Sequence, residues 1–196
     1  MATALFVLSQ LYAAIPLAGP VAVELGSGTA FALSTSFGFS YAAGFLVWGP
    51  VSDRFGRKRV MSIALGVLVL ATLLCAAARS VPAMAVFRAL QGLAASGFAP
   101  VALAYLSEAV RPARRVGAIG AMSTAFLVAG IFGQVLASVI VLHSEWTWFF
   151  VISGVALAVA LGLILLLVRE SAPQGPPLSL LGQFGTLARL FLKPEI

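Results

Sequence analysis

The stretch Gly49-Pro-Val-Ser-Asp53-Arg54-Phe-Gly56-Arg57-Lys58-Arg59 separates two long apolar runs and combines two glycines, one acid and four bases. Asp53 and Arg57 are four residues apart, so they can pair if the helix continues through them. Gly49 allows close helix packing, and Gly56 permits a tight turn. A basic loop with a helix cap would account for the bases, but not for the spacing of the glycines and the acid. We therefore expect a short, structured loop between two helices.

The composition around this loop is that of a membrane protein. The chain has 196 residues, of which 61% are hydrophobic and 9% charged, and its mean hydropathy is +1.08. A soluble domain is about 45–50% apolar and about 25% charged, and a disordered chain is far less hydrophobic. The single cysteine, Cys75, lies within an apolar run, which excludes an intrachain disulfide and a cysteine-based metal cluster.

Six apolar runs are long enough to cross a bilayer core of about 30 Å as helices. Their lack of strict alternation favours helices over barrel strands, and no base precedes the first run as in a signal peptide. We predict an all-α membrane protein with a six-transmembrane-helix bundle over residues 1–168. The spans are expected at 2–23, 29–51, 60–78, 81–106, 117–142 and 146–168.

The distribution of Lys and Arg among the loops predicts the orientation. Ten lie on one side, and Arg79 is the single base in a loop on the other side. The ten are Arg54, Arg57, Lys58, Arg59, Arg111, Arg114, Arg115, Arg169, Arg189 and Lys193. Because positive loops stay in the cytoplasm, we expect both termini there. The net charge of +6 is then a topology signal, not a sign of nucleic-acid binding.

Residues 169–196 differ in character from the spans. A polar stretch rich in Pro and Gly is followed by apolar residues at helical spacing, from Leu180 to Phe191. We expect a cytoplasmic linker with an interfacial amphipathic helix lying on the membrane. The alternative is a helix that binds a partner protein.

The quoted stretch resembles the G-x-L-x-D-R-x-G-R-K signature of the major facilitator superfamily. It falls between the second and third expected spans, as in that family, with Val51 in place of the usual leucine. The resemblance extends over residues 2–196, and the similarity to bacterial efflux permeases implies a location in a bacterial plasma (inner) membrane. The resemblance also implies the N-terminal half of a fold in which two six-helix bundles, each of nested inverted repeats, enclose a central path. The implied cytoplasmic gate loop consists of Gly49, Asp53, Arg54, Gly56, Arg57 and Lys58.

Charged residues at the end of the fourth span extend the expected gate. The resemblance implies that Glu108 joins a charge network with Asp53 and Arg57. We expect Arg111 and Arg115, which follow Glu108 closely, to belong to the same network. The alternative is a solvated helix end with local ion pairs, which contribute about 0–1 kcal/mol each.

Polar residues inside the spans are candidates for a substrate or coupling cavity. Arg88, Gln91 and Gly92 lie on one helix face and resemble the R-x-x-Q-G element of drug:proton antiporters. An arginine within a span normally faces a cavity or a partner, although it can also extend to the interface. Tyr12, four residues before a proline, resembles a Y-x-x-x-P pattern of bacterial efflux members. The other cavity candidates are Gln10, Ser40 and Gln134.

Small residues occupy every fourth position of the fifth span, and this stripe predicts close approach of another helix. Its members are Gly117, Ala121, Ala125, Ala129, Gly133 and Ala137. Part of the stripe resembles the fifth-helix antiporter motif G-x-x-x-G-P-x-x-G-G. Gln134 stands where that motif has proline.

The resemblance implies a secondary active transporter that works by alternating access and exports a small organic molecule or drug by proton antiport. The expected partners are the lipid bilayer, the substrate, protons and a second six-helix half, supplied by the same gene, a separate chain or a homodimer. No cofactor and no metal are expected. Enzyme activity is not expected either, because the single histidine, His143, lies in an outer loop and no phosphate loop is present.

Two alternatives stay open from the sequence. The chain could be a truncated or split product without transport activity of its own. It could also belong to a permease of the same superfamily that takes up sugars or other small solutes. No span carries a carboxylate at its middle, where many drug:proton antiporters titrate one, so proton coupling follows from the resemblance alone.

Overall fold

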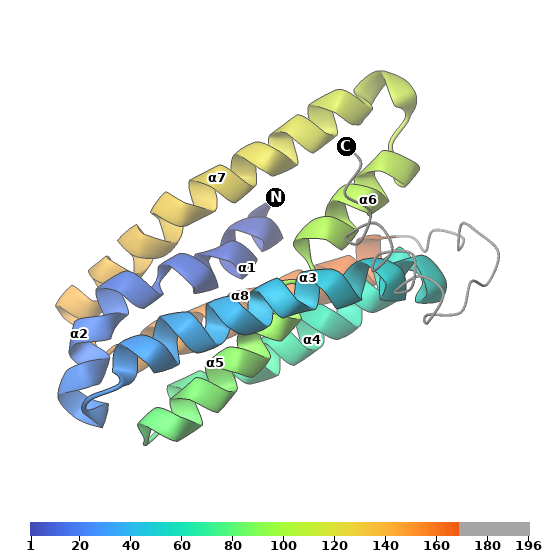
Figure 1. Ribbon diagram of the computed structural model, residues 1–196. Helices are drawn as coiled ribbons and strands as arrows, with labels where there is room; N and C mark the ends of the chain where they lie inside the picture. Colours follow the sequence, from blue (N-terminus) through green and yellow to red (C-terminus); the bar gives the residue numbers. More distant parts are fainter. Residues whose placement is uncertain (169–196) are drawn as a thin grey trace, which may run out of the picture.

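The computed structural model describes residues 1–168, and all regular structure among them is helical (Figure 1). The elements are α1 (Ala2–Tyr12), α2 (Ala14–Leu25), the π-helical turn η1 (Phe31–Thr35), α3 (Ser36–Phe55), α4 (Arg57–Ala76), α5 (Val81–Ala95), α6 (Ala99–Ala109), α7 (Pro112–His143) and α8 (Thr147–Leu167). The all-α fold is thereby confirmed. The predicted linker helix lies outside the described residues.

The helices correspond in order to the six expected spans. Among residues 1–168, five helices are long and apolar enough to cross a membrane, and α1 with α2 makes a sixth if the bent pair is one span. The largest difference in bounds is at the start of α7, which begins at Pro112 and not at Gly117. Proline at the first position of a helix has a suitable φ and needs no N–H partner, so this helix begins within the polar loop.

Two of the spans that were expected to be continuous helices are interrupted. α1 and α2 meet at an angle of 51° at Ala13. α5 and α6 are separated by Ser96–Phe98. In each case a proline follows, Pro16 or Pro100, and its missing N–H leaves the carbonyl four residues earlier without its helical partner. The prolines were the sequence signal for both interruptions.

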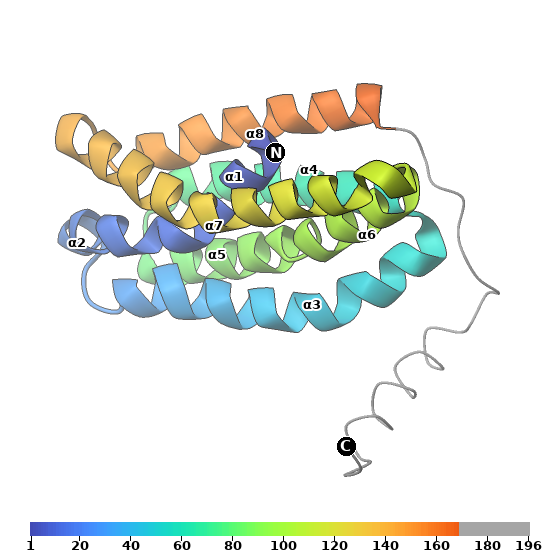
Figure 2. The same ribbon diagram turned by 90° about the horizontal axis from the view of Figure 1, so that it is seen from above.

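The helices pack in pairs around a common core (Figures 1 and 2). α1 lies along α7, α3 lies along α5, and α4 packs between α5 and α8. A Cβ on Gly133 would lie 2.7 Å from the Cα of Ser9 in α1. The close approach predicted by the small-residue stripe is therefore present in the second half of α7. At Gly117, however, a Cβ would meet no atom within 4 Å, so the stripe does not extend to that end of the helix among the described residues.

The buried core consists of two apolar clusters with polar residues between them. One cluster, toward the α3–α4 turn, includes Val7 and Leu65. The other, toward the opposite end of the bundle, includes Leu17 and Met84. Between the clusters, α1, α4 and α5 contribute the buried polar side chains of Gln10, Thr72, Arg88 and Gln91. These side chains are thus enclosed by apolar packing on both sides.

Candidate functional site

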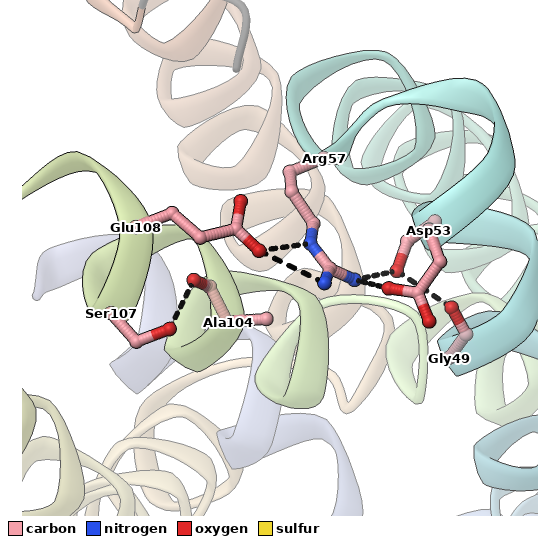
Figure 3. Close-up of polar contacts among 7 residues, drawn as sticks. Gly49, Asp53, Arg57, Ala104, Ser107 and Glu108 are labelled. Atoms are coloured by element: carbon pink, nitrogen blue, oxygen red, sulfur yellow. Dashed lines mark hydrogen bonds and ion pairs between the residues drawn. The ribbon is translucent and has the colours of Figure 1, made fainter. Parts of the chain in front are cut away.

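Arg57, the first residue of α4, binds two acids from different elements (Figure 3). Its Nη1 lies 2.5 Å from Oδ1 of Asp53 in the last turn of α3. Its Nη2 and Nε donate to Oε1 of Glu108 in α6, at 3.0 and 3.2 Å. Nη1 also donates to Oγ of Ser52, at 2.6 Å. We call Ser52, Asp53, Arg57 and Glu108 the charged cluster, and the end of the bundle where it lies the charged end.

The α3–α4 turn that carries the cluster consists of Gly56 alone. Gly56 has φ +93°, a region that residues with a Cβ rarely adopt. Its N–H donates to the carbonyl of Ser52 at 3.1 Å, and its carbonyl accepts from the N–H of Val60 at 3.2 Å. Asp53 and Arg57 therefore pair as predicted, but across a turn and not along a continuous helix. The tight turn expected at Gly56 is confirmed.

The cluster differs in part from the predicted network. Ser52 was not predicted; it lies five residues before Arg57, a spacing that brings the two together once the chain turns at Gly56. Arg111 is exposed and Arg115 is half-buried. Within residues 1–168 neither forms an ion pair, so the structure does not place them in the network.

The other residues of the expected gate loop have separate contacts. The guanidinium of Arg54 lies 5.4 Å from the ring centroid of Phe55. Nζ of Lys58 donates to the carbonyl of Leu165 in the last turn of α8, at 3.0 Å. A Cβ on Gly49 would meet no atom within 4 Å, so no close packing is present at Gly49 among the described residues.

Arg88 of α5 is the centre of a second polar site, inside the bundle, where it is 1% exposed. Its Nε donates to the carbonyl of Leu33 at 2.9 Å, and its Nη2 donates to the carbonyl of Gln10, also at 2.9 Å. Its Nη1 donates to Oε1 of Gln91 at 2.5 Å. The guanidinium lies 4.3 Å from the ring centroid of Phe37, a cation–π contact. The residue binds backbone and amide oxygens and no carboxylate among the described residues.

Gln91 joins this arginine to two further helices. Its Nε2 donates to Oε1 of Gln10 in α1 at 3.0 Å and to Oγ1 of Thr72 in α4 at 2.8 Å. We call Gln10, Thr72, Arg88 and Gln91 the polar network. Because buried polar groups are costly unless they are hydrogen-bonded, a network with this many partners fixes the relative positions of α1, α4 and α5.

Both backbone acceptors of Arg88 lie at irregular points of helices. Leu33 belongs to the π-turn η1, and Gln10 lies three residues before the α1–α2 break at Ala13. Irregular turns leave carbonyls without their helical partners, and at membrane depth such groups need partners within the protein. Arg88 thus satisfies backbone groups that the two distorted spans expose.

The structure brings three of the predicted cavity residues, Gln10, Arg88 and Gln91, together in the polar network, but it does not expose them to a cavity among residues 1–168. Gln10 and Gln91 are 0% exposed, Arg88 is 1% exposed, and all three are enclosed inside the bundle. A Cβ on Gly92 would lie 2.3 Å from the carbonyl oxygen of Phe37, so this glycine serves helix packing. The expectation that these residues line a cavity is not met among residues 1–168. Two of the hydrogen-bond partners of Arg88 are backbone carbonyls, and the sequence pattern did not predict them.

The remaining cavity candidates lie on other parts of the bundle. Tyr12, next to the α1–α2 break, is 37% exposed, and its ring lies 3.6 Å from where a Cβ on Gly130 would stand. Gln134 is half-buried and donates to the carbonyl of Gly130 in its own helix, at 3.3 Å. Ser40 is half-buried on α3.

The opposite end of the bundle carries a smaller polar contact that the sequence did not predict. Nε1 of Trp146 donates to Oε2 of Glu24 at 2.6 Å, and Nη1 of Arg79 lies 3.7 Å from the other carboxylate oxygen. This contact joins the end of α2 to the start of α8. No group of three or more metal-binding side chains occurs within the part of the chain that was described.

Comparison with known proteins decides the family. The model of the Major Facilitator Superfamily matches residues 1–194. The chain belongs to this superfamily. The helical bundle, the glycine turn and the charged cluster are thus those of a superfamily member, and its apolar helices are those of an integral membrane protein.

Relatives and solved structures extend the comparison. The chain is 28% identical over 154 residues to Multidrug resistance protein 3 of Bacillus subtilis, covering 78% of this chain and 30% of that protein. It is 32% identical over 141 residues to the Multidrug export protein EmrB of Haemophilus influenzae, covering 71% and 27%. A bacterial homolog of the human lysosomal transporter Spinster, in an inward-facing conformation, aligns with TM-score 0.64 and 22% identity, covering 98% of this chain and 48% of that one. This superfamily chain therefore spans less than a third of those two relatives and about half of that structure.

Proposed function

We propose that this superfamily chain acts as the N-terminal half of a secondary active transporter that works by alternating access. We further propose that the whole protein exports a small organic molecule or drug in exchange for protons. The names of the relatives from Bacillus subtilis and Haemophilus influenzae support export of drugs. The lengths of these relatives support a second six-helix half that completes the path.

The charged cluster is the observation that carries this proposal. Arg57 joins the α3–α4 turn to α6, and its side chain and that of Glu108 are each 17% exposed. The side chain of Asp53 is 46% exposed, and one of its carboxylate oxygens is paired with Arg57. Its other oxygen is available to a group outside the described residues. A helix N-terminus in the second half, which carries about half a positive charge, is a suitable partner.

In this proposal the cluster is a latch at the cytoplasmic end. When the two halves close over the charged end, Asp53 binds the second half. Arg57 stays paired with both Asp53 and Glu108 and so keeps Asp53 in position. When the halves rock apart, Asp53 releases its outer partner and keeps Arg57. The path to the cytoplasm then opens without separating the charged groups within this half.

Substitution of Asp53 tests the latch. Asp53→Asn keeps the size of the side chain but removes the charge that the second half would bind. With ethidium as the probe, we expect dye export from cells expressing the whole protein to fall to background while its level in the membrane stays unchanged. The matched control is Glu145→Gln, an exposed acid at the opposite end of the bundle, which should export dye at the parent rate. Export by Asp53→Asn at the parent rate would refute the latch.

Proton coupling is tested separately with the whole protein in proteoliposomes. We expect ethidium to accumulate against its gradient when a pH gradient is imposed, and accumulation to stop when an ionophore collapses that gradient. Accumulation that survives the collapse would show that protons are not exchanged. The latch would still stand in that case if Asp53→Asn abolished transport.

A further inference from the structure

A groove on the outer surface of the charged end lies outside the machinery described so far. It runs between the last turns of α3 and the first turns of α4 and has a volume of about 240 Å³. Its walls are Trp48, Val51, Phe55, Arg59, Val60 and Ile63. Phe55 is 48% exposed and Ile63 is 53% exposed, so the groove opens away from the core.

The groove follows from the way in which α3 and α4 are joined. The two helices meet at the single residue Gly56 and then diverge, as α3 runs along α5 and α4 runs toward α8 (Figure 1). Trp48 forms a fixed part of the wall, because its Nε1 donates to the carbonyl of Leu93 at 2.7 Å. A Cβ on Gly97 would lie 3.0 Å from the Trp48 ring. The wall at Trp48 is therefore already in place before anything binds.

Arg59 is the one charged residue in the groove wall. It lies in the first turn of α4, is exposed, and forms no ion pair or side-chain hydrogen bond with the described residues. The site thus combines an open apolar channel with a cation at the end of a membrane-spanning helix. Long basic side chains in this position reach the headgroup region, and basic pockets between helices on the cytoplasmic side bind anionic headgroups.

We propose that this groove binds an anionic phospholipid, with one acyl chain against Trp48 and Ile63 and the phosphate on Arg59. A cationic solute would be repelled by Arg59 and by the neighbouring Arg54. A small soluble anion would leave the apolar wall uncovered. A zwitterionic lipid brings a second, positive group toward two arginines. An acidic phospholipid can cover the apolar wall with an acyl chain and pair its phosphate with Arg59.

Native mass spectrometry of the purified protein tests the site. The probes are phosphatidylglycerol and phosphatidylcholine with identical acyl chains, titrated in detergent. We expect phosphatidylglycerol to bind more tightly, and Arg59→Gln to weaken its binding about fivefold, as expected for one basic residue near a lipid surface. The matched control is Arg111→Gln, which removes an exposed base at the same end but outside the groove and should leave binding unchanged.

A second pair of variants tests the apolar wall. Ile63→Trp should fill the groove and weaken phosphatidylglycerol binding, while Leu70→Trp, 63% exposed two turns further along α4, should have no effect. All four positions are exposed, so the variants are expected to fold. Equal effects of Arg59→Gln and Arg111→Gln would overturn the proposal, as would equal effects of the two tryptophan variants. Equal binding of the two lipids to the parent protein would also overturn it.

Discussion

Arg57 and Arg88 are both bound by three groups, yet they represent two different uses of arginine in one bundle. Arg57 lies at the charged end, with its side chain 17% exposed, and pairs with two carboxylates. Arg88 lies between the two apolar clusters, is 1% exposed, and binds two carbonyls and an amide. The partners of Arg57 can exchange with water or with other charges, whereas those of Arg88 have no substitute. The comparison separates a site that can rearrange from one that holds the fold.

Removing Arg88 should have the largest effect on this comparison. Arg88→Met leaves the carbonyls of Leu33 and Gln10 without their donor inside the bundle, and each such group costs about 1–3 kcal/mol. We expect a loss of about 4 kcal/mol in the free energy of unfolding, measured by thermal unfolding of the purified protein. Arg88→Lys should recover little of the loss, because an ammonium cannot span both carbonyls. A stability change as small as that of Arg111→Met would contradict a structural role.

The α1–α7 approach beside the polar network gives the next largest effect. Gly133→Ala places a Cβ 2.7 Å from the Cα of Ser9, so α1 must shift. Gln10, the next residue in α1, moves with it. We expect a destabilisation of about 3 kcal/mol, at the upper end of overpacking effects. Gly117→Ala, where a Cβ meets nothing within 4 Å, is the control and should be neutral or slightly stabilising in the same melting assay.

A substitution in the turn that carries the charged cluster should lower the stability by a smaller amount. Gly56→Ala forces an alanine to φ +93°, which costs about 2 kcal/mol. The strain should also shift Arg57 relative to Asp53, so dye export should fall together with the melting temperature. Gly49→Ala, seven residues earlier on α3, adds a Cβ that meets no described atom within 4 Å and should leave the melting temperature nearly unchanged. A Gly56→Ala protein that melts like the parent would show that the positive φ is not required.

Breaking a charge pair in the cluster should affect stability least. Glu108→Gln removes one partly exposed partner of Arg57, and Asp53 and Ser52 remain to bind it. We expect a loss of about 1 kcal/mol or less, smaller still at high salt because the pair is screened. Melting curves at low and high salt check this prediction. A loss comparable to that of Arg88→Met would remove the distinction between the two arginines.

The sequence predicted the charged end better than the interior. The glycine turn and the Asp53–Arg57 pair could be anticipated because both depend on residue types a few positions apart. Glu108 was placed by family resemblance. Ser52 was missed because it reaches Arg57 only after the chain has turned at Gly56.

The prediction for the interior was incomplete for a physical reason, which Arg88 illustrates. A buried arginine was expected to face a cavity, since a charge needs a partner. Its partners proved to be carbonyls at Leu33 and Gln10, and every residue carries a carbonyl, so no side-chain pattern marks them. Which carbonyls are free depends on where helices are distorted. Pro16 indicated the break after α1, but no residue in η1 predicted a π-turn.

The order of the network along the chain has a consequence for how the protein enters the membrane. Arg88 on an isolated helix would oppose insertion by about 2.5–3.5 kcal/mol. The groups that bind it from other elements belong to Gln10 and Leu33, and the Phe37 ring lies over its guanidinium. All three precede it in the sequence, so they are synthesised before α5. If the spans enter the bilayer in the order of synthesis, the acceptors of Arg88 are in place before the arginine, and its cost of insertion is lowered.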